Sequence, residues 1–434
     1  MGYTKQKILN MAETEDVEFI RLQFTDLFGT LKNVAITKSQ LAKALDNKIM
    51  FDGSSIEGFA RIEESDMYLY PDLDSFAIFP WNAGGNRVAR LICDVYGQDG
   101  LPFAGDPRNV LKRVMVECQK MGYKFNVGPE CEFFLFHTDE EGRPTTVSHE
   151  KAGYFDVAPL DLGESARRDM ILNLEDMGFE IEASHHEVAP AQHEIDFAFE
   201  DALSTADKVM TFKMAVRTIA KRYGLHATFM PKPKAEANGS GMHIQFSLIK
   251  NGENVFECAD RPGELSEEAY YFIGGLLAHS KEMALITNPL VNSYKRLVPG
   301  YDAPTELTWT ENNQNSLVRI PVTRGEGIRV ELRSPDASAN PYVVLAVCLA
   351  AGLDGIKNKI TPTKSSNLAA QDQQAEHLPE TLKEAIDYFE SSSWVKEVLG
   401  EEFCRQYVAA KKNEWLRYTR QVTDWEIAEY LYRL

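Results

Sequence analysis

Two glutamates separated by a single residue stand directly before a strongly apolar run in this chain. Residues 128–136 read Gly-Pro-Glu-Cys-Glu-Phe-Phe-Leu-Phe. On a β-strand, residues i and i+2 point to the same face, so Glu130 and Glu132 would share a face with their Cα atoms about 7 Å apart. Like charges at the edge of a core are costly unless a cation neutralises them. The segment therefore predicts a strand that either carries a cation site or, in the simpler alternative, ends at the surface.

Length, charge and cysteine content restrict the class of protein that can contain such a strand. Of the 434 residues, 44% are hydrophobic, which is enough for one large core or two unequal ones and excludes a disordered chain. The 46 basic and 65 acidic residues give a net charge of −19, so we expect neither a nucleic-acid partner nor an anionic membrane surface. The six cysteines are scattered without a Cys-x-x-Cys pair, which argues against a disulfide framework or a zinc knuckle.

Localisation is expected to be cytoplasmic. No apolar signal segment stands near the N-terminus, and the longest apolar stretch, residues 342–353, is too short to cross a bilayer. We therefore expect no membrane partner.

The first part of the chain is expected to form a separate α+β unit. The pattern is helical at 4–13 and 37–46, strand-like at 17–24 and 88–95, and loop-like at 50–59. Residues 98–109 are rich in Gly, Pro and Asp, which indicates a linker. We therefore place one domain at 1–100 and a second at 101–434.

In the second domain, short strands alternate with long helices, which is typical of a mixed α/β or α+β catalytic body. A helix is expected at 107–121, with Pro107 near its start. The further expected elements lie at 127–136, 165–178, 180–187, 192–199, 204–223, 225–230, 241–249, 266–288, 317–320, 328–333 and 341–358. The last sixty residues are expected to be mostly charged helix.

Two further clusters place polar side chains on strand faces or at strand ends. Glu187 and Glu194 flank a proline-containing turn, and such a turn can bring two strand ends together. His243, Gln245 and Ser247 would share one strand face, and the glycines before them permit a close backbone approach to a ligand. A lone histidine in this setting is more often structural than a ligand.

The last cluster, Arg-Val-Glu-Leu-Arg at 329–333, places a glutamate between two arginines on one strand face. Hard oxygen ligands with one imidazole suit Mg²⁺ or Mn²⁺, whereas zinc or iron draws more His or Cys. Arginines beside such acids suggest an anionic substrate, most naturally the phosphate of a nucleotide. Together the clusters predict a metal- and phosphate-dependent enzyme with the ligand set Glu130, Glu132, Glu187, Glu194, His243 and Glu331.

Eight segments, in their order and spacing, resemble glutamine synthetase type I, the glutamate–ammonia ligase family, over nearly the whole chain. They are residues 50–59, 61–72, 128–136, 182–197, 238–243, 292–304, 329–336 and 351–360. The resemblance implies an α+β fold, with a small N-terminal β-grasp-like domain and a catalytic domain built on a curved antiparallel sheet, or half-barrel, with helices. The region 361–383 is short and lacks a tyrosine, as in short-form members that are not adenylylated.

The resemblance also implies the reaction and the assembly. The γ-phosphate of ATP passes to the side-chain carboxylate of L-glutamate, and ammonia then displaces phosphate from γ-glutamyl phosphate to give L-glutamine, ADP and phosphate. The expected assembly is a dodecamer of two hexameric rings, in which each active site lies between one N-terminal domain and a neighbour's catalytic domain.

Individual residues acquire expected roles in the same way. The resemblance implies two or more Mg²⁺ or Mn²⁺ ions per subunit, one held by Glu132, Glu187 and Glu194 and another by Glu130, His243 and Glu331. Glutamate is expected at Asn238, Gly239, Arg296, Asp302 and Arg333, and ATP, the co-substrate, at Glu182, Ser247, Arg319 and Arg329. The expected catalytic set is Asp52, Asp302, Arg319 and Arg333, with Asp52 as the base that deprotonates ammonium. Arg61 matches an arginine implicated in product inhibition, where the alternative is a surface pair with Glu63 or Glu64.

Three departures from the family pattern fall around this site. Residues 234–236 are Lys-Ala-Glu where the family has a hydrophobe followed by Phe-Gly, Asp302 replaces a glutamate, and Gln314 replaces an arginine that contacts the transferring phosphate. Two alternatives follow, namely a glutamate–amine ligase that accepts a larger amine and a weakly active or regulatory homologue. The intact metal set and Asp52 argue against a regulatory protein.

Overall fold

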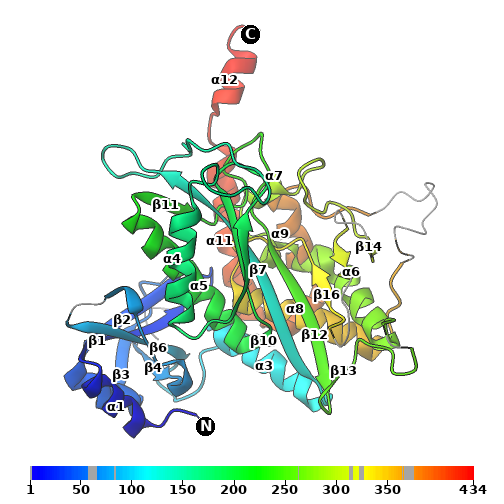
Figure 1. Cartoon of the computed structure of the whole chain (residues 1–434). Helices are drawn as coiled ribbons and strands as arrows, with labels where there is room; N and C mark the ends of the chain where they lie inside the picture. The colour runs from blue at the N-terminus through cyan, green and yellow to red at the C-terminus, as the bar shows by residue number, and fades with distance from the viewer. Residues whose placement is uncertain are drawn as a thin grey trace.

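A computed structural model describes residues 2–56, 66–82, 85–261, 263–311, 316–321, 327–363, 365 and 376–434 of the chain (Figure 1). Its N-terminal part forms a small mixed sheet, drawn in blue, beside a larger body built on a second sheet. The elements of the N-terminal part are α1 Lys5–Thr14, β1 Val17–Thr25, β2 Leu31–Thr37, η1 Lys38–Gln40, α2 Leu41–Leu45, β3 Ile49–Asp52, β4 Asp66–Pro71, η3 Leu73–Ser75, β5 Ala77–Ile78, η4 Pro80–Asn82 and β6 Arg87–Tyr96.

The N-terminal sheet has the strand order β2-β1-β6-β4-β3, with β5 paired to β6. Strands β1 and β6 run parallel and the other pairs are antiparallel. The buried side chains of Ile20, Leu22 and Phe24 join the core of this sheet, as the alternation in β1 predicts. The predicted loop at 50–59 is wrong in its first part, because residues up to Asp52 pair with β4 as strand β3. Strands β2 and β4 are not among the elements that the sequence predicts.

The larger sheet follows the order β14-β15-β16-β12-β7-β9-β8, with β10 and β11 paired to β7 and β13 paired to β12. All of these pairs are antiparallel except β14 with β15. This sheet is the predicted half-barrel, and the α+β prediction is confirmed. Its strands are β7 Lys124–His137, β8 Ile181–His186, β9 Gln192–Phe197, β10 Glu200–Asp201, β11 Leu225–Thr228, β12 Met242–Lys250, β13 Glu253–Asn254, β14 Trp309–Thr310, β15 Val318–Arg319 and β16 Val330–Leu332.

Helices complete the larger body, and the first three of them pack directly against its sheet. The long helices lie close to the positions that the sequence predicts. The helices are α3 Pro107–Lys120, α4 Glu164–Glu175, α5 Ala202–Arg222, α6 Glu267–Thr287, α7 Ser293–Arg296, α8 Pro341–Asn358, α9 Leu382–Ser391, α10 Ser393–Leu399, α11 Glu401–Thr419 and α12 Asp424–Tyr430. Helix α12 ends the chain and projects away from the body (Figure 1).

Helix α8 lies at the centre of the larger body. It is long and apolar enough to cross a membrane, but most of it is buried, and it packs against α6 and α3. Asn340 begins the helix, because its Oδ1 accepts a hydrogen bond from the Tyr342 amide at 3.2 Å. The Nδ2 of the same side chain donates to the carbonyls of Asp26 and Leu27, at 3.2 and 3.3 Å. One amide side chain therefore joins α8 to the N-terminal sheet.

Helices α6 and α8 approach each other through glycines. A Cβ atom on Gly275 would lie 2.0 Å from the carbonyl oxygen of Ala351, and one on Gly355 would lie 2.0 Å from the carbonyl oxygen of Tyr271. These neighbours are backbone atoms that cannot turn aside, so the crossing requires residues without a side chain.

We expect Gly275→Ala to lower the free energy of unfolding in urea by about 3 kcal/mol, the upper end of the range for overpacked cores, because the added methyl collides with the α8 backbone. Ala278→Leu, an exposed position on the same helix, is the control and should change that free energy by less than about 0.5 kcal/mol. Equal effects of the two substitutions at one fixed protein concentration would contradict the proposed tightness of the crossing.

Candidate active site

Strand register brings the predicted acidic residues onto one face of the larger sheet. In β7, Glu130 lies opposite His243 of β12 and opposite Asp196 of β9. Glu132, two residues further on the same strand, lies opposite Glu194 of β9. Directly opposed residues in an antiparallel pair have their side chains on the same face. Five titratable groups therefore converge on the concave side of three adjacent strands.

One side of this cluster contains Glu130, His243 and Glu331, whose ligand atoms lie within 4.8 Å of one another. The Nδ1 atom of His243 is 3.4 Å from Glu130 and 3.9 Å from Glu331. Glu331 is completely buried between two cations, with Arg333 Nη1 at 2.6 Å and Arg319 Nη1 at 3.0 Å. The predicted juxtaposition of these three residues is thus present in the structure.

The other side contains Glu132, Glu187 and Glu194, but these three do not form so close a group. The ligand atoms of Glu194 lie within 4.8 Å of those of His185 and Asp196. Glu132 and Glu187 instead line a small cavity together. Glu132 is fixed within this cavity, because its Oε2 accepts hydrogen bonds from Gln192 Nε2 at 2.8 Å and from the Gly241 amide at 3.0 Å.

Burial and mutual repulsion favour the protonated forms of these carboxyl groups. Burial, followed by the charge of Glu132, raises the pKa of Glu187 to about 8. Burial, followed by the charge of Glu130, raises the pKa of Asp196 to about 7. Burial and then the charge of Asp196 raise the pKa of Glu194 well above its usual range. Few cations offset these charges, so a bound divalent cation would stabilise the ionised set.

The chemistry of the donors fits a hard divalent cation. Burial, with the nearby charge of Arg333, lowers the pKa of His243 well below its usual range, so the imidazole is neutral and has a lone pair to donate. The Oδ1 atom of Asp196 is buried without a hydrogen-bond partner within the described structure. Carboxylate oxygens with one neutral imidazole match the ligand preference of Mg²⁺ or Mn²⁺.

The small cavity beside Glu132 also includes most of the residues predicted to hold glutamate. It is lined by Glu132, Glu187, Gln192, Asn238, Gly239, Arg296, Tyr301 and Asp302. A Cβ atom on Gly239 would lie 2.2 Å from the Pro231 carbonyl oxygen, so this position requires glycine, while the close approach of this loop to a ligand stays a prediction. Asp302 adopts a left-handed backbone with φ of 51°, and its Oδ1 lies 3.9 Å from Arg333 Nη2.

Two of the arginines differ in how much of each guanidinium group is already bonded. Arg296 is buried and donates to the carbonyls of Ser334 at 2.8 Å and Arg333 at 3.1 Å, so part of its hydrogen-bonding capacity holds the main chain. The Nε atom of Arg333 is buried without a partner in the part of the chain that the structure describes. Arg296 nevertheless lines the small cavity, whereas Arg333 is paired with Glu331 beside it.

Of the residues predicted to contact the nucleotide, Ser247, Arg319 and Arg329 lie on the β12, β15 and β16 side of the sheet, whereas Glu182 lies on β8 at its other end. Ser247 is buried on β12, and Arg329 Nη1 donates to Gln245 Oε1 at 3.2 Å. The Arg329 guanidinium also lies 4.1 Å over the ring of Phe199. Glu182 is exposed on β8, where its charge contributes to the raised pKa of Asp196.

Asp52 lies apart from this cluster, at the end of β3 in the N-terminal sheet. Its Oδ1 accepts hydrogen bonds from the Ser54 hydroxyl at 2.6 Å and the Ser54 amide at 2.8 Å, which lower its pKa. No described interaction joins Asp52 to the metal-type ligands of its own chain. Arg61 and Gln314 lie outside the described residues. Lys234 lies 5.2 Å over the Phe136 ring, so it is packed against an apolar cluster.

Sequence reasoning missed the groups that support the acidic residues. Gln192 binds both Glu132 and the Gly239 carbonyl, the latter at 3.0 Å. Its place two residues before Glu194 in a strand is a signal that could have revealed it. A buried network also underlies the β8–β9 hairpin, in which His186 Nε2 lies 2.8 Å from Glu150, and His186 Nδ1 lies 2.6 Å from the Glu187 carbonyl oxygen. The segment that supplies Glu150 has no pattern that would have revealed it.

Comparison with known proteins identifies two matching family models. The model described as the catalytic domain of glutamine synthetase matches residues 104–430, and the model described as its beta-Grasp domain matches residues 16–98. The glutamine synthetase of Clostridium saccharobutylicum is 59% identical over 437 residues, covering 99% of both chains. The glutamine synthetase of Staphylococcus aureus strain Mu50 is 52% identical over 438 residues, covering 99% of this chain and 98% of the relative.

Solved structures show the same fold. The complex of GmaS with ADP superposes with a TM-score of 0.89 at 32% identity, covering 98% of this chain and 99% of that chain. The glutamine synthetase of Plasmodium falciparum superposes with a TM-score of 0.89 at 24% identity, covering 99% of both chains.

We expect the metal-free protein to lose stability as the pH rises from about 5 to about 8. Carboxyl groups with raised pKa values, such as Glu187 at about 8 against an ordinary 4.5, keep protons in the folded chain that the unfolded chain has released. The folded state then binds more protons than the unfolded state, so the free energy of unfolding falls with pH over this interval. Saturating Mg²⁺ should flatten the fall, because the cation displaces these protons.

Urea denaturation at several pH values measures this slope. Glu187→Gln removes one titrating group, so the slope should decrease by up to about 1.4 kcal/mol per pH unit. Glu140→Gln, which changes an exposed glutamate outside the cluster, is the control and should retain the native slope. A slope that is insensitive both to Mg²⁺ and to Glu187→Gln would contradict this account.

Proposed function

This chain belongs to the glutamine synthetase family and is a ligase that makes glutamine from glutamate, ammonia and ATP, and we propose that the acidic face described above carries this reaction. The observation that supports this placement most strongly is the register of β7, which gathers Glu130, Glu132, Glu194 and His243 beside a glycine-containing loop. An acidic face with a hard-cation donor set and adjacent arginines is suited to phosphoryl transfer.

We assign two divalent cations, Mg²⁺ or Mn²⁺, to this face. Glu130, His243 and Glu331 would hold one of them, and Glu132, Glu187 and Glu194 the other. Divalent ions of this kind neutralise the charge that develops on a transferring phosphoryl group. Repulsion among the buried carboxylates supports both assignments, because it is relieved when cations are present.

The chain's own residues would orient the two substrates around the transferred phosphoryl group. Asn238, Gly239 and Arg296 line the cavity assigned to glutamate. Arg333 lies beside Asp302, which lines that cavity, and its buried Nε atom has no hydrogen-bond partner within the described structure. Arg319 and Arg333 flank Glu331, so both guanidinium groups can stabilise negative charge at the same place.

ATP is assigned to the neighbouring end of the same face. Arg329, which lies over Phe199, and the buried Ser247 define this end, with Glu182 across the sheet at β8. The ADP that the related GmaS structure contains supports a nucleotide site in this fold.

Assembly completes the proposed site. Asp52 is ionised and held by Ser54, but it lies in the N-terminal sheet away from its own chain's acidic face. A dodecamer of two hexameric rings would place Asp52 beside a neighbour's site, where it can accept a proton from ammonium. The projecting C-terminal segment supports contact between copies, because Trp425, Leu431 and Tyr432 are largely exposed apolar side chains.

Three further assignments rest on the sequence. We propose domains at 1–100 and 101–434, a cytoplasmic protein, and product inhibition through Arg61. Separate apolar cores support the domain division, because one is built from residues up to Val95 and the other mainly from residues after Val110.

The acceptor amine is tested by measuring glutamate- and ATP-dependent phosphate release with ammonium and with methylamine or ethylamine. We expect kcat/KM for ammonium to exceed that for either amine by at least about tenfold, equivalent to 1.4 kcal/mol. The alternative is a larger amine, which the shorter Asp302 side chain would admit, and a reversed preference would establish it. Glu132→Gln should lower activity by more than about tenfold, whereas the control Glu140→Gln should retain it.

Mixing of inactive chains tests the shared site. Asp52→Ala and Glu331→Ala should each be inactive, since each removes one half of every site. When the two are co-assembled at equal amounts, random mixing restores about a quarter of the sites, because each intact site needs one unaltered residue from each of two chains. Mixed oligomers that stay inactive, with mixing verified by native mass spectrometry, would place the whole site within one chain.

A further inference from the structure

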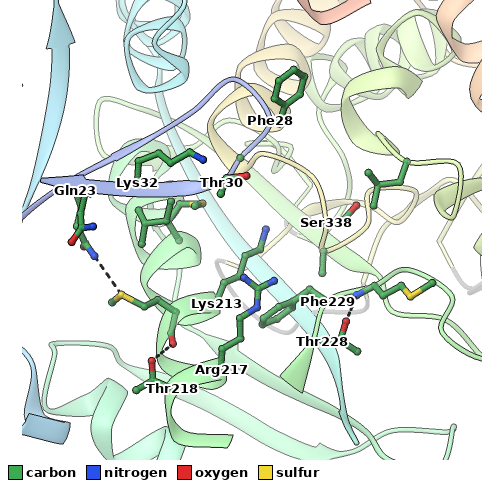
Figure 2. Close-up of a pocket in the computed structure, with 18 of the residues that line it drawn as sticks. Gln23, Phe28, Thr30, Lys32, Lys213, Arg217, Thr218, Thr228, Phe229 and Ser338 are labelled. Carbon is green, nitrogen blue, oxygen red and sulfur yellow. Dashed lines mark hydrogen bonds between the residues drawn. The ribbon is translucent and has the colours of Figure 1, made fainter. Parts of the chain in front are cut away.

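A second cavity lies between the N-terminal sheet and the catalytic body (Figure 2). Its volume is about 580 Å³, within the range of small-molecule pockets. The turn between β1 and β2 forms one wall, and residues of α5 and of the segment after β11 form the other. None of its lining residues belongs to the candidate active site.

The charge of this cavity is opposite to that of the chain. Its lining includes four cationic side chains, those of Arg21, Lys32, Lys213 and Arg217, and no carboxylate. The whole chain has a net charge of −19, so a cationic cavity without acids is not what its composition alone would give. Lys32 pairs with Asp26 at 3.3 Å, although Asp26 is not one of the lining residues.

Two of these cations have no carboxylate within ion-pair distance in the described structure, and one of them, Lys213, is buried while the other, Arg217, is exposed. Lys213 is only 7% exposed, and its described polar contact is one hydrogen bond from Nζ to the Ala339 carbonyl oxygen, at 3.0 Å. Arg217 has no ion pair in the part of the chain that the structure describes and instead lies 5.2 Å over the Phe229 ring. Both side chains come from consecutive turns of α5 and extend into the same space (Figure 2).

The positive charge of the buried Lys213 is disfavoured when the cavity holds only water. Burial, together with the charge of Arg217, lowers the pKa of Lys213 to about 8. An anion between the two groups would reverse this repulsion and satisfy donors that the protein leaves unused.

The rest of the lining combines polar side chains with an apolar group of aromatic, methionine and leucine residues. Phe28, Phe229, Met230 and Leu290 line the cavity together with two methionines of α5, Met210 and Met214. Aromatic and methionine side chains favour an organic group over a bare inorganic ion.

We propose that this cavity binds a small organic anion, with its phosphate or carboxylate group between Lys32, Lys213 and Arg217 and its apolar part against Phe28, Phe229 and Met230. The site is distinct from the one assigned to catalysis, so its occupant is an effector rather than a substrate.

The contacts of the cavity provide a route to the catalytic face. Lys213 binds the carbonyl of Ala339, in the segment that follows β16 and its Glu331. Met230 precedes Pro231, whose carbonyl accepts a hydrogen bond from the Ser240 amide at 2.8 Å in the loop beside the glutamate cavity. On the other wall, Gln23 of β1 donates to Met214 Sδ at 3.3 Å. An occupant would therefore act on two active-site segments and on the seating of the N-terminal sheet.

Matched probes test the proposal with the full-length oligomer. Phenyl phosphate and phenylacetate carry the same ring on different anionic groups, and benzyl alcohol is the uncharged control. Calorimetric titration in saturating ADP and Mg²⁺ keeps the nucleotide site filled, and activity is measured with all three substrates saturating. We expect at least one of the two anions to bind once per chain and to change kcat by at least about twofold, whereas benzyl alcohol does neither.

Variants then locate the binding. Arg217→Met should weaken binding of that anion by at least about tenfold, as expected for a lost charged hydrogen bond, while basal kcat stays within about twofold. Lys221→Met, one turn further along α5 and outside the cavity lining, should leave binding unchanged. Lys32→Met, on the opposite wall, serves if Arg217→Met does not fold, and the same loss is expected.

The outcomes separate the alternatives. Binding of phenyl phosphate alone identifies a phosphate-bearing effector, and binding of phenylacetate alone a carboxylate. Failure of both anions to bind, or equal loss of binding in Lys221→Met and Arg217→Met, would overturn the proposal. Basal activity is measured in the same samples as anion binding. An error in the catalytic assignments would therefore be recognised from basal activity, independently of whether the anion binds.

Discussion

Repulsion among carboxylates that the strand register forces together is the constraint around which the larger domain is organised. The pairing of β7 with β9 and β12 allows no other placement of Glu130, Glu132 and Glu194, because a shift by one residue would turn all of them away from the concave face. A rigid surrounding is needed to hold such a set together. The glycine-mediated crossing of α6 and α8 and the buried network beneath the β8–β9 hairpin contribute to that rigidity.

The negative charge of these glutamates is neutralised unevenly across the acidic face of the larger sheet. Glu331 already has two arginines within 3.0 Å. For Glu132, Glu187 and Glu194, the ion pairs within the described structure involve only histidines. The carboxylates on the β8–β9 side therefore depend most on added cations for neutralisation of their negative charge. On the β15–β16 side, the arginine guanidinium groups are already in position beside Glu331. A reaction that moves negative charge between the two substrates can use both properties.

The sequence predicts the elements with long periodic patterns and the chemistry of the site, but not all of its geometry. Strand β7 and helices α5, α6 and α8 lie close to their expected bounds, because their apolar patterns are long. The loop expected around Asp52 is partly strand, since pairing with β4 outweighs the weak local pattern. The roles of Gln192 and Asp196 are not predicted from the sequence, because the hydrogen bond to Glu132 and the lack of a partner for Asp196 Oδ1 within the described structure arise only from the register. The cationic cavity could not be predicted, since its walls come from segments nearly two hundred residues apart.

Asn340 has a consequence for how the two parts of this protein can change over evolution. Its side chain both begins α8 and donates to the carbonyls of Asp26 and Leu27, so the start of the central helix and the turn after β1 share one amide group. A chimera that exchanges the N-terminal domain with that of a relative must keep these two carbonyls in position, or the first turn of α8 loses its alignment with the rest of the chain. An insertion in the turn at residues 26–30 would have the same effect, although the turn is short and lies at the edge of a sheet. The linker would therefore allow the two domains to be exchanged separately, but the hydrogen bonds of Asn340 connect them in the folded structure. Recombination between relatives should preserve these hydrogen bonds more strictly than the linker sequence.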